Sequence, residues 1–385
     1  MTIDKADLLD RYRRLSRRLA EIPFREWSSR FAATDRNPWI DGSFGLHPSS
    51  ADWDLYGLVD MLLCGLTLEP SLPMPGGFDP QRWADRILSC LDGNGLATRR
   101  NQTLHVPEHA TAYAYAGLVL LDSRGARIDP PPLRYFPTGT FDEAAFERWF
   151  DRMGWQFPRW VPGRGLRESL RISARRLGWF RFWTGSHVVG GMIAAMLMRE
   201  RLAASADRRP PTHDQPEVAA FFQLADRRID PRTGLWRPFF KRLVSRHGDL
   251  ADVGGAAHFL WLYDWTGVPH PSPEPMLRTV LRLQQPDGSF MRRPGCIDLD
   301  CTHLLSYASR LGAGSPDEID RAMACNGIAV LERLLARDGL CGHGESHSLP
   351  GALCALSQID AYLRRRGLES GRCPTFDVLS EVCWI

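Results

Sequence analysis

The sequence predicts an all-α protein in which six helical hairpins close into an (α/α)6 toroid. Three observations predict this fold class: a turn motif that recurs along the chain, an apolar segment of helical spacing after each copy, and very few segments with the alternating pattern of strands. We expect residues 1–385 to form one domain of this kind. Residues 130–162, which are rich in proline and tryptophan, are expected to form an insertion on the rim of the ring.

A turn built on Asp-Gly or Thr-Gly marks the start of each repeat. Clear copies begin at Asp41, Asp92, Thr233, Asp287 and Asp338, and a degenerate copy lies at residues 178–180. Glycine suits such a turn because it has no Cβ and readily adopts the backbone conformation that ends a helix tightly. Starts that lie roughly 50 residues apart, with one longer gap, predict six hairpins.

The segments that follow the turns are apolar on several faces and are expected to form the inner helices of the ring. They cover residues 52–66, 109–121, 187–198, 252–265, 298–311 and 347–363. The stretches between them are more amphipathic and are expected to form the outer helices, most clearly at residues 275–283 and 317–336. The starts of the inner helices would then surround one central cavity.

Composition narrows the classes of function. Hydrophobic residues make up 44% of the chain and charged residues 24%, which argues against disorder. The net charge of +3 gives no strong attraction to nucleic acid, so no such partner is expected. Residues 1–21 are charged throughout and no apolar run has the length of a membrane span, so cytoplasm is the expected location. The nine cysteines include no Cys-x-x-Cys pair and indicate no disulfide framework.

The turn at residues 284–290 reads Gln-Gln-Pro-Asp-Gly-Ser-Phe and resembles the Gln-x-x-x-Gly-x-Trp repeat of triterpene and diterpene cyclases. Phe290 stands at the tryptophan position. In a similar copy, Asp230 stands at the glutamine position and Trp236 at the tryptophan position. The resemblance implies the α/α toroid shared by terpenoid cyclases, protein prenyltransferase β subunits and, more distantly, many sugar-active (α/α)6 barrels.

The densest polar cluster, residues 297–303, follows this turn and reads Ile-Asp-Leu-Asp-Cys-Thr-His. It resembles the Asp-x-Asp-Asp-Thr element of class II terpene cyclases, whose middle aspartic acid protonates an alkene or epoxide. The resemblance implies an isomerase-type enzyme that protonates and cyclises an isoprenoid, with Asp300 as general acid and Asp298 and His303 tuning it. A carboxylic acid in a dry pocket can perform such a step when neighbouring donors stabilise the charge that the proton transfer leaves on it. Cys301 replaces the last aspartic acid of the element.

Other polar and aromatic residues near the expected inner-helix starts are candidates for binding the substrate, besides their ordinary role in capping helices. This hypothesis requires no cofactor; Mg²⁺ would assist only with a diphosphate substrate, for which Arg292 and Arg293 are possible partners. The expected partner is a small molecule of isoprenoid type, and peripheral membrane contact and oligomeric state stay open. The candidate binding residues are His109, Tyr113, His187, Trp236, His258, Glu345 and His347.

Two alternatives use the same region. Protein prenyltransferase β subunits hold zinc with Asp and Cys at one inner-helix start and His at the next, and Cys301 with His347 resembles that arrangement; Zn²⁺ would then be a cofactor. The Asp-x-Cys spacing of that family is missing, because Leu299 lies at its Asp position. A carbohydrate-active (α/α)6 enzyme, whether hydrolase, lyase or epimerase, would instead use histidines with an acid, and tryptophans to stack on sugar rings.

Overall fold

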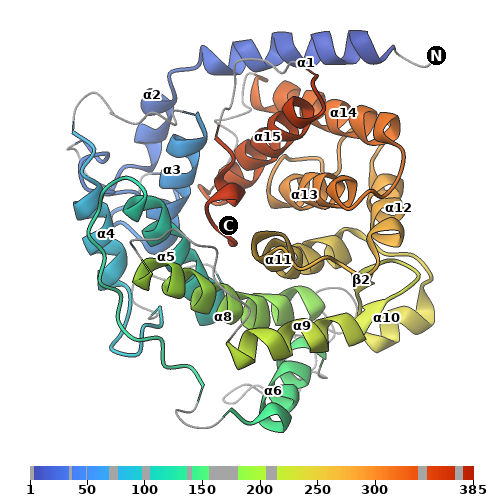
Figure 1. Ribbon diagram of the computed structural model, residues 1–385. Coiled ribbons are helices and arrows are strands. Elements are labelled where there is room, and N and C mark those ends of the chain that lie inside the picture. The colour runs from blue at the N-terminus through green and yellow to red at the C-terminus, as the bar shows by residue number, and fades with distance from the viewer. Residues whose placement is uncertain are drawn as a thin grey trace, which may run out of the picture.

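A computed structural model gives the fold of the chain (Figure 1). It describes residues 4–33, 37–48, 50–68, 77–97, 105–136, 141–155, 181–204, 215–336, 345–368 and 376–385. Most of these residues are helical, and the strands among them form one short pair, so the all-α prediction is confirmed. The expected turns at Asp338 and at residues 178–180 lie outside the described residues. Within the described part, no helix is both long and apolar enough to cross a bilayer.

The segments predicted to be inner helices are all helical. They are α3 (Leu55–Leu68), α5 (Pro107–Asp122), α8 (Arg181–Ala203), α11 (Leu250–Thr266), α13 (Cys296–Arg310) and α15 (Ser348–Arg365). Most of their side chains are buried, as their apolar composition requires. Each of these helices contacts the next one in chain order, and α15 also contacts α3, so the first and the last member of the series are neighbours. Figure 1 shows them around a central region that also holds the end of residues 376–385.

A second set of helices packs on the outside of this series (Figure 1). It consists of α1 (Lys5–Ala20), α4 (Pro80–Ser89), α6 (Glu143–Trp155), α9 (Pro216–Arg228), α12 (Pro273–Leu283) and α14 (Pro316–Leu334). α4 packs against α5, α6 against α8, α12 against α13, and α14 against α1 and α15. α6 falls in the stretch predicted to be a rim insertion, and it packs against α8 and α9. The last residues of that stretch, 156–162, lie outside the described residues.

Short elements complete the described chain. They are α2 (Phe24–Ser28), η1 (Ser29–Phe31), the antiparallel strands β1 (Ile229–Asp230) and β2 (Leu235–Trp236), α10 (Phe239–Val244) and η2 (Val378–Ser380). The two strands are two residues long each and flank the turn of the third clear repeat. The cysteines in the described residues form no disulfide, as the sequence predicts.

The recurring turns join successive helices as the sequence motif predicts. Gly288 has a φ of 87°, and a Cβ on it would lie 2.5 Å from the carbonyl oxygen of Cys325 in α14, so only glycine fits there. The side-chain amide of Gln284 donates to the carbonyl oxygens of Gly288 at 2.9 Å and of Ala322 at 2.8 Å. The motif therefore fixes the end of α12 to α14 through both its glutamine and its glycine.

A fully buried arginine holds the segment between β2 and α11. The Nε of Arg237 donates to Asp252 at 3.0 Å, and its Nη1 donates to Asp230 at 3.0 Å. The same guanidinium also donates to the carbonyl oxygens of Ser245 and His247. Since Asp252 caps the first turn of α11, the cluster fixes where this inner helix begins.

Candidate active site

A cavity of about 480 Å³ lies among the inner helices. Its lining comes from the first half of α5, from α8 and α11, from the start of α13 and the segment before it, and from the residues just before α15. Aromatic and aliphatic side chains form much of the wall, including Trp183, Trp261, Met291, Ile297 and Ile385. The volume falls within the range of roughly 300–1,000 Å³ that is typical of sites for small molecules.

Five histidines from different parts of the chain meet in this cavity. The ring centroid of His105 lies 4.4 Å from that of His109 and 5.2 Å from that of His347. The ring centroid of His187 lies 4.6 Å from that of His109 and 4.5 Å from that of His258. The sequence predicted four of these residues as candidates, and the structure brings all four together with His105.

Buried partners orient the rings of three of these histidines. The Nδ1 of His347 lies 3.0 Å from Oδ1 of Asp60 in α3, and the hydroxyls of Tyr113 and Ser346 also donate to that carboxylate. Because a carboxylate oxygen can only accept, Nδ1 of His347 carries the hydrogen of this bond, and Nε2 is the ring nitrogen that Asp60 does not engage.

His258 is held in a similar way. The hydroxyl of Ser186 donates its only hydrogen to the carbonyl oxygen of Trp183 at 2.7 Å, so it accepts from Nδ1 of His258 at 3.0 Å. Nε2 of His258 is then the unprotonated nitrogen. On His109, Nδ1 lies 2.9 Å from the hydroxyl oxygen of Tyr56, which fixes the position of that ring.

Burial favours the neutral form of four of these imidazoles, those of His105, His109, His187 and His258. Desolvation lowers the pKa of His105 and of His258 to about 3 in each case, with a further contribution from neighbouring histidines. The same causes lower the pKa of His109 and of His187 well below the usual value of 6.5. The cavity therefore presents several neutral imidazole nitrogens, which can accept a proton or bind a metal ion.

These pKa values predict that the protein loses stability in acid. Between about pH 6.5 and pH 3, His105 and His258 bind protons in the unfolded chain but not in the folded one, so the free energy of unfolding falls as pH falls. Each histidine contributes roughly 1.4 kcal/mol per pH unit across this window. Urea unfolding at a series of pH values measures this slope, and replacing both histidines by glutamine should reduce it. A slope unchanged in that double variant would contradict the assignment.

Asp300 reaches the same cavity from the second turn of α13. Its carboxyl group is buried, and burial together with the nearby Asp298 raises its pKa well above the usual value. A carboxyl group whose pKa is raised keeps its proton to higher pH and is a potential proton donor. Of the other groups predicted to bind substrate, Glu345 also lines the cavity. Of the two arginines named as possible partners of a diphosphate, Arg293 lines the cavity and Arg292 does not.

Other predicted site residues lie outside the cavity lining. The carboxylate of Asp298 accepts from the backbone N–H of Gly295 at 3.2 Å and from Asn326 at 3.0 Å, so it caps α13 and fixes α14. Its proximity to Asp300 still raises the pKa of that acid. The Nε2 of His303 lies 3.7 Å from Asp264 of α11, about one turn beyond Asp300 along α13.

Tyr113, Trp236 and Cys301 are also buried without lining the cavity. Tyr113 acts on the site indirectly, through its bond to Asp60. The indole N–H of Trp236 donates to the carbonyl oxygen of Ala225 in α9 at 2.8 Å, so this aromatic residue of the repeat packs against a neighbouring outer helix. Among the described residues, the groups that could hold a metal ion contain His347 but not Cys301.

Sequence reasoning missed His105 and Asp60. His105 precedes α5, and the available signal was its position four residues before His109, next to the start of an expected inner helix. Asp60 is an acid in the middle of the apolar helix α3, and an ionisable residue in such a segment is rarely buried without a partner. Its partner follows 287 positions later, so no local pattern identifies it.

The chain near its last described residues closes one side of the histidine cluster. The ring centroid of Trp384 lies 5.3 Å from that of His109 and 4.9 Å from that of His258. The site thus combines a buried carboxylic acid, neutral imidazoles and aromatic side chains around one cavity. Comparisons of this chain with models of known protein families, with curated proteins and with solved structures give no match.

Proposed function

We propose that the chain is an (α/α)6-toroid enzyme of class II terpene cyclase type, which protonates and cyclises an isoprenoid in the central cavity. The observation that carries this proposal is the position of Asp300, a buried carboxyl group with a raised pKa in a cavity with aromatic and aliphatic walls. The toroid is supported by the contacts among the inner helices, in which α15 meets α3.

The chemistry follows from the groups in the cavity. The O–H of Asp300 donates its proton to one carbon of a substrate double bond, which leaves a carboxylate on the protein and a carbocation on the substrate. The face of Trp183, a partly buried side chain that lines the cavity, can stabilise that cation. A second double bond attacks the cation and closes a ring. Loss of a proton from the cyclic cation to Nε2 of His258 gives a neutral product with the composition of the substrate.

A carbohydrate-active enzyme receives less support from the geometry. Tryptophans that bind sugars stack their faces on the ligand and need to be accessible to it. Trp261 is 3% exposed and Trp236 is fully buried. The aromatic and aliphatic side chains of the cavity wall fit an apolar substrate better than a glycan chain.

Turnover in D₂O tests the proposed reaction. Purified protein is incubated with acyclic isoprenoids, namely farnesol- and geranylgeraniol-type alcohols, their diphosphates and squalene, and the products are analysed by mass spectrometry. We expect a cyclic product that carries one deuterium atom on carbon, because the carboxyl proton of Asp300 exchanges with solvent. Parallel incubation in H₂O identifies the mass of the unlabelled product. Absence of conversion, or a product without deuterium, would overturn the proposal.

A further inference from the structure

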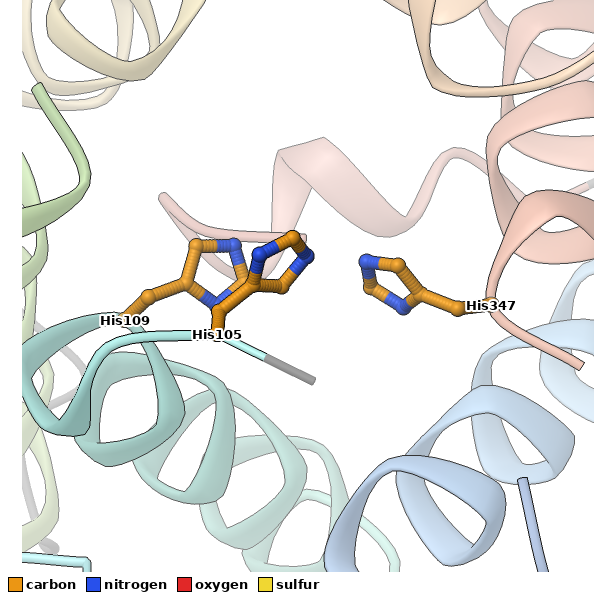
Figure 2. A group of neighbouring side chains, drawn as sticks. All are labelled: His105, His109 and His347. Carbon is orange, nitrogen blue, oxygen red and sulfur yellow. The ribbon is translucent and has the colours of Figure 1, made fainter. Parts of the chain in front are cut away.

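Three of the cavity histidines face one another across the space between α5 and α15. Figure 2 shows His105 and His109 on one side and the ring of His347 approaching them from the other. One ring nitrogen of each residue lies within 4.8 Å of the others. We propose that His105, His109 and His347 bind a divalent transition-metal ion of the zinc type. This site is independent of the cyclase reaction proposed above.

The donor set suits such an ion. Imidazole nitrogen is a good ligand for zinc and its neighbours in the first transition series. Three protein ligands with a fourth position open to the cavity are the usual arrangement at catalytic zinc sites. His105 and His109 are four residues apart around the start of α5, and His347 immediately precedes α15, so two inner-helix starts supply the ligands. Zinc–nitrogen bonds of about 2.0–2.1 Å require the rings to move slightly closer together.

Asp60 is the strongest indication that the nitrogen of His347 is prepared for a metal ion. A histidine that binds metal commonly donates its other ring N–H to a carboxylate, which fixes the tautomer and makes the ligand more basic. Nδ1 of His347 donates to Asp60, whose side chain is fully buried, and this leaves Nε2 for the metal. Tyr113 and Ser346 complete the bonds of this carboxylate, so Asp60 acts as an anchor for the histidine.

A second group of histidines shares one member with the first. The ring nitrogens of His109, His187 and His258 also lie within 4.8 Å of one another. In that group, His258 is oriented by the neutral hydroxyl of Ser186. All three of its members are buried, whereas His105 in the first group is only partly buried. The carboxylate anchor and the more accessible ligand both favour the first group.

Binding of Co²⁺ and Zn²⁺ tests the site directly. The full chain is treated with a chelator, then titrated with Co²⁺ while its visible spectrum is recorded, and with Zn²⁺ in a calorimeter. We expect one ion per chain and cobalt absorption typical of nitrogen ligands. His105→Ala, which removes a partly buried ligand, should weaken binding at least 100-fold. Asp60→Asn should weaken it by about 10–100-fold, the usual effect of losing such an anchor.

Matched variants separate the possible outcomes. His270→Ala removes a buried histidine outside the cavity and should leave metal binding unchanged. Asp300→Asn should also retain the metal, so that failure of the cyclase proposal and failure of the metal proposal are distinguishable. Absence of binding by the unmodified chain would overturn the inference. Loss of binding in His258→Ala combined with normal binding in His105→Ala would overturn it too, since the ion would then lie in the second group.

Discussion

Replacement of Asp300 by asparagine is expected to lower the turnover number by about 10²–10⁴-fold, the usual contribution of a general acid. Asparagine has nearly the same shape as aspartic acid, but its amide cannot donate a proton to carbon. Since Asp300 is buried and its pKa is raised, a neutral amide in its place should also be tolerated by the fold. The measurement is single-turnover kinetics together with the helical circular dichroism and the melting temperature.

Asp298→Asn is the matched control for this experiment. Asp298 lies two positions away but caps α13 and bonds Asn326, so its loss should mainly lower the melting temperature. We expect its turnover number to fall far less than that of Asp300→Asn. Near-normal turnover in Asp300→Asn on the true substrate would remove Asp300 from the mechanism.

Replacement of Arg237 by methionine is expected to lower the free energy of unfolding by about 3–5 kcal/mol. The guanidinium is fully buried and bonds both Asp230 and Asp252, so its removal takes the cation that joins these two buried carboxylates out of the interior. Lys241 still reaches Asp252 at 2.7 Å, which limits but does not cancel the loss. Urea unfolding followed by circular dichroism measures the change.

Arg232→Met provides the comparison. Arg232 also bonds Asp230, at 3.1 Å, but 45% of its side chain is exposed to solvent. Ion pairs at such positions contribute roughly 0–1 kcal/mol, so this variant should be almost as stable as the unmodified protein. Equal losses in the two variants would show that burial of Arg237 does not determine its contribution.

The helices could be predicted from the sequence because their cause is local. Apolar residues on all faces identified α3, α5, α8, α11, α13 and α15 as buried helices, and the turn glycines separated them. The predicted bounds differ by a few residues at most ends. α8 begins at Arg181, several residues before the expected start at residue 187. The expected start was late because the first residues of the helix precede its clearly apolar segment.

The site was only partly predictable, because helical geometry decides which neighbours in sequence share a face. Successive residues of a helix are rotated by about 100°, so Asp298 and Asp300 point in nearly opposite directions. The first therefore meets α14 and the second meets the cavity. His303 lies about one turn further along α13 and faces Asp264. The meeting of five histidines depends on tertiary structure, which no local pattern contains.

The bond between His347 and Asp60 has a consequence for how the protein is made. The two residues are 287 positions apart, so at synthesis rates of about 5–20 residues per second Asp60 emerges about 15–60 s before its partner exists. During that time α3 exposes the apolar surface that α15 will cover. We therefore expect the nascent chain to expose surface prone to aggregation until α15 is made, and a product truncated before α15 to leave Asp60 without its histidine partner.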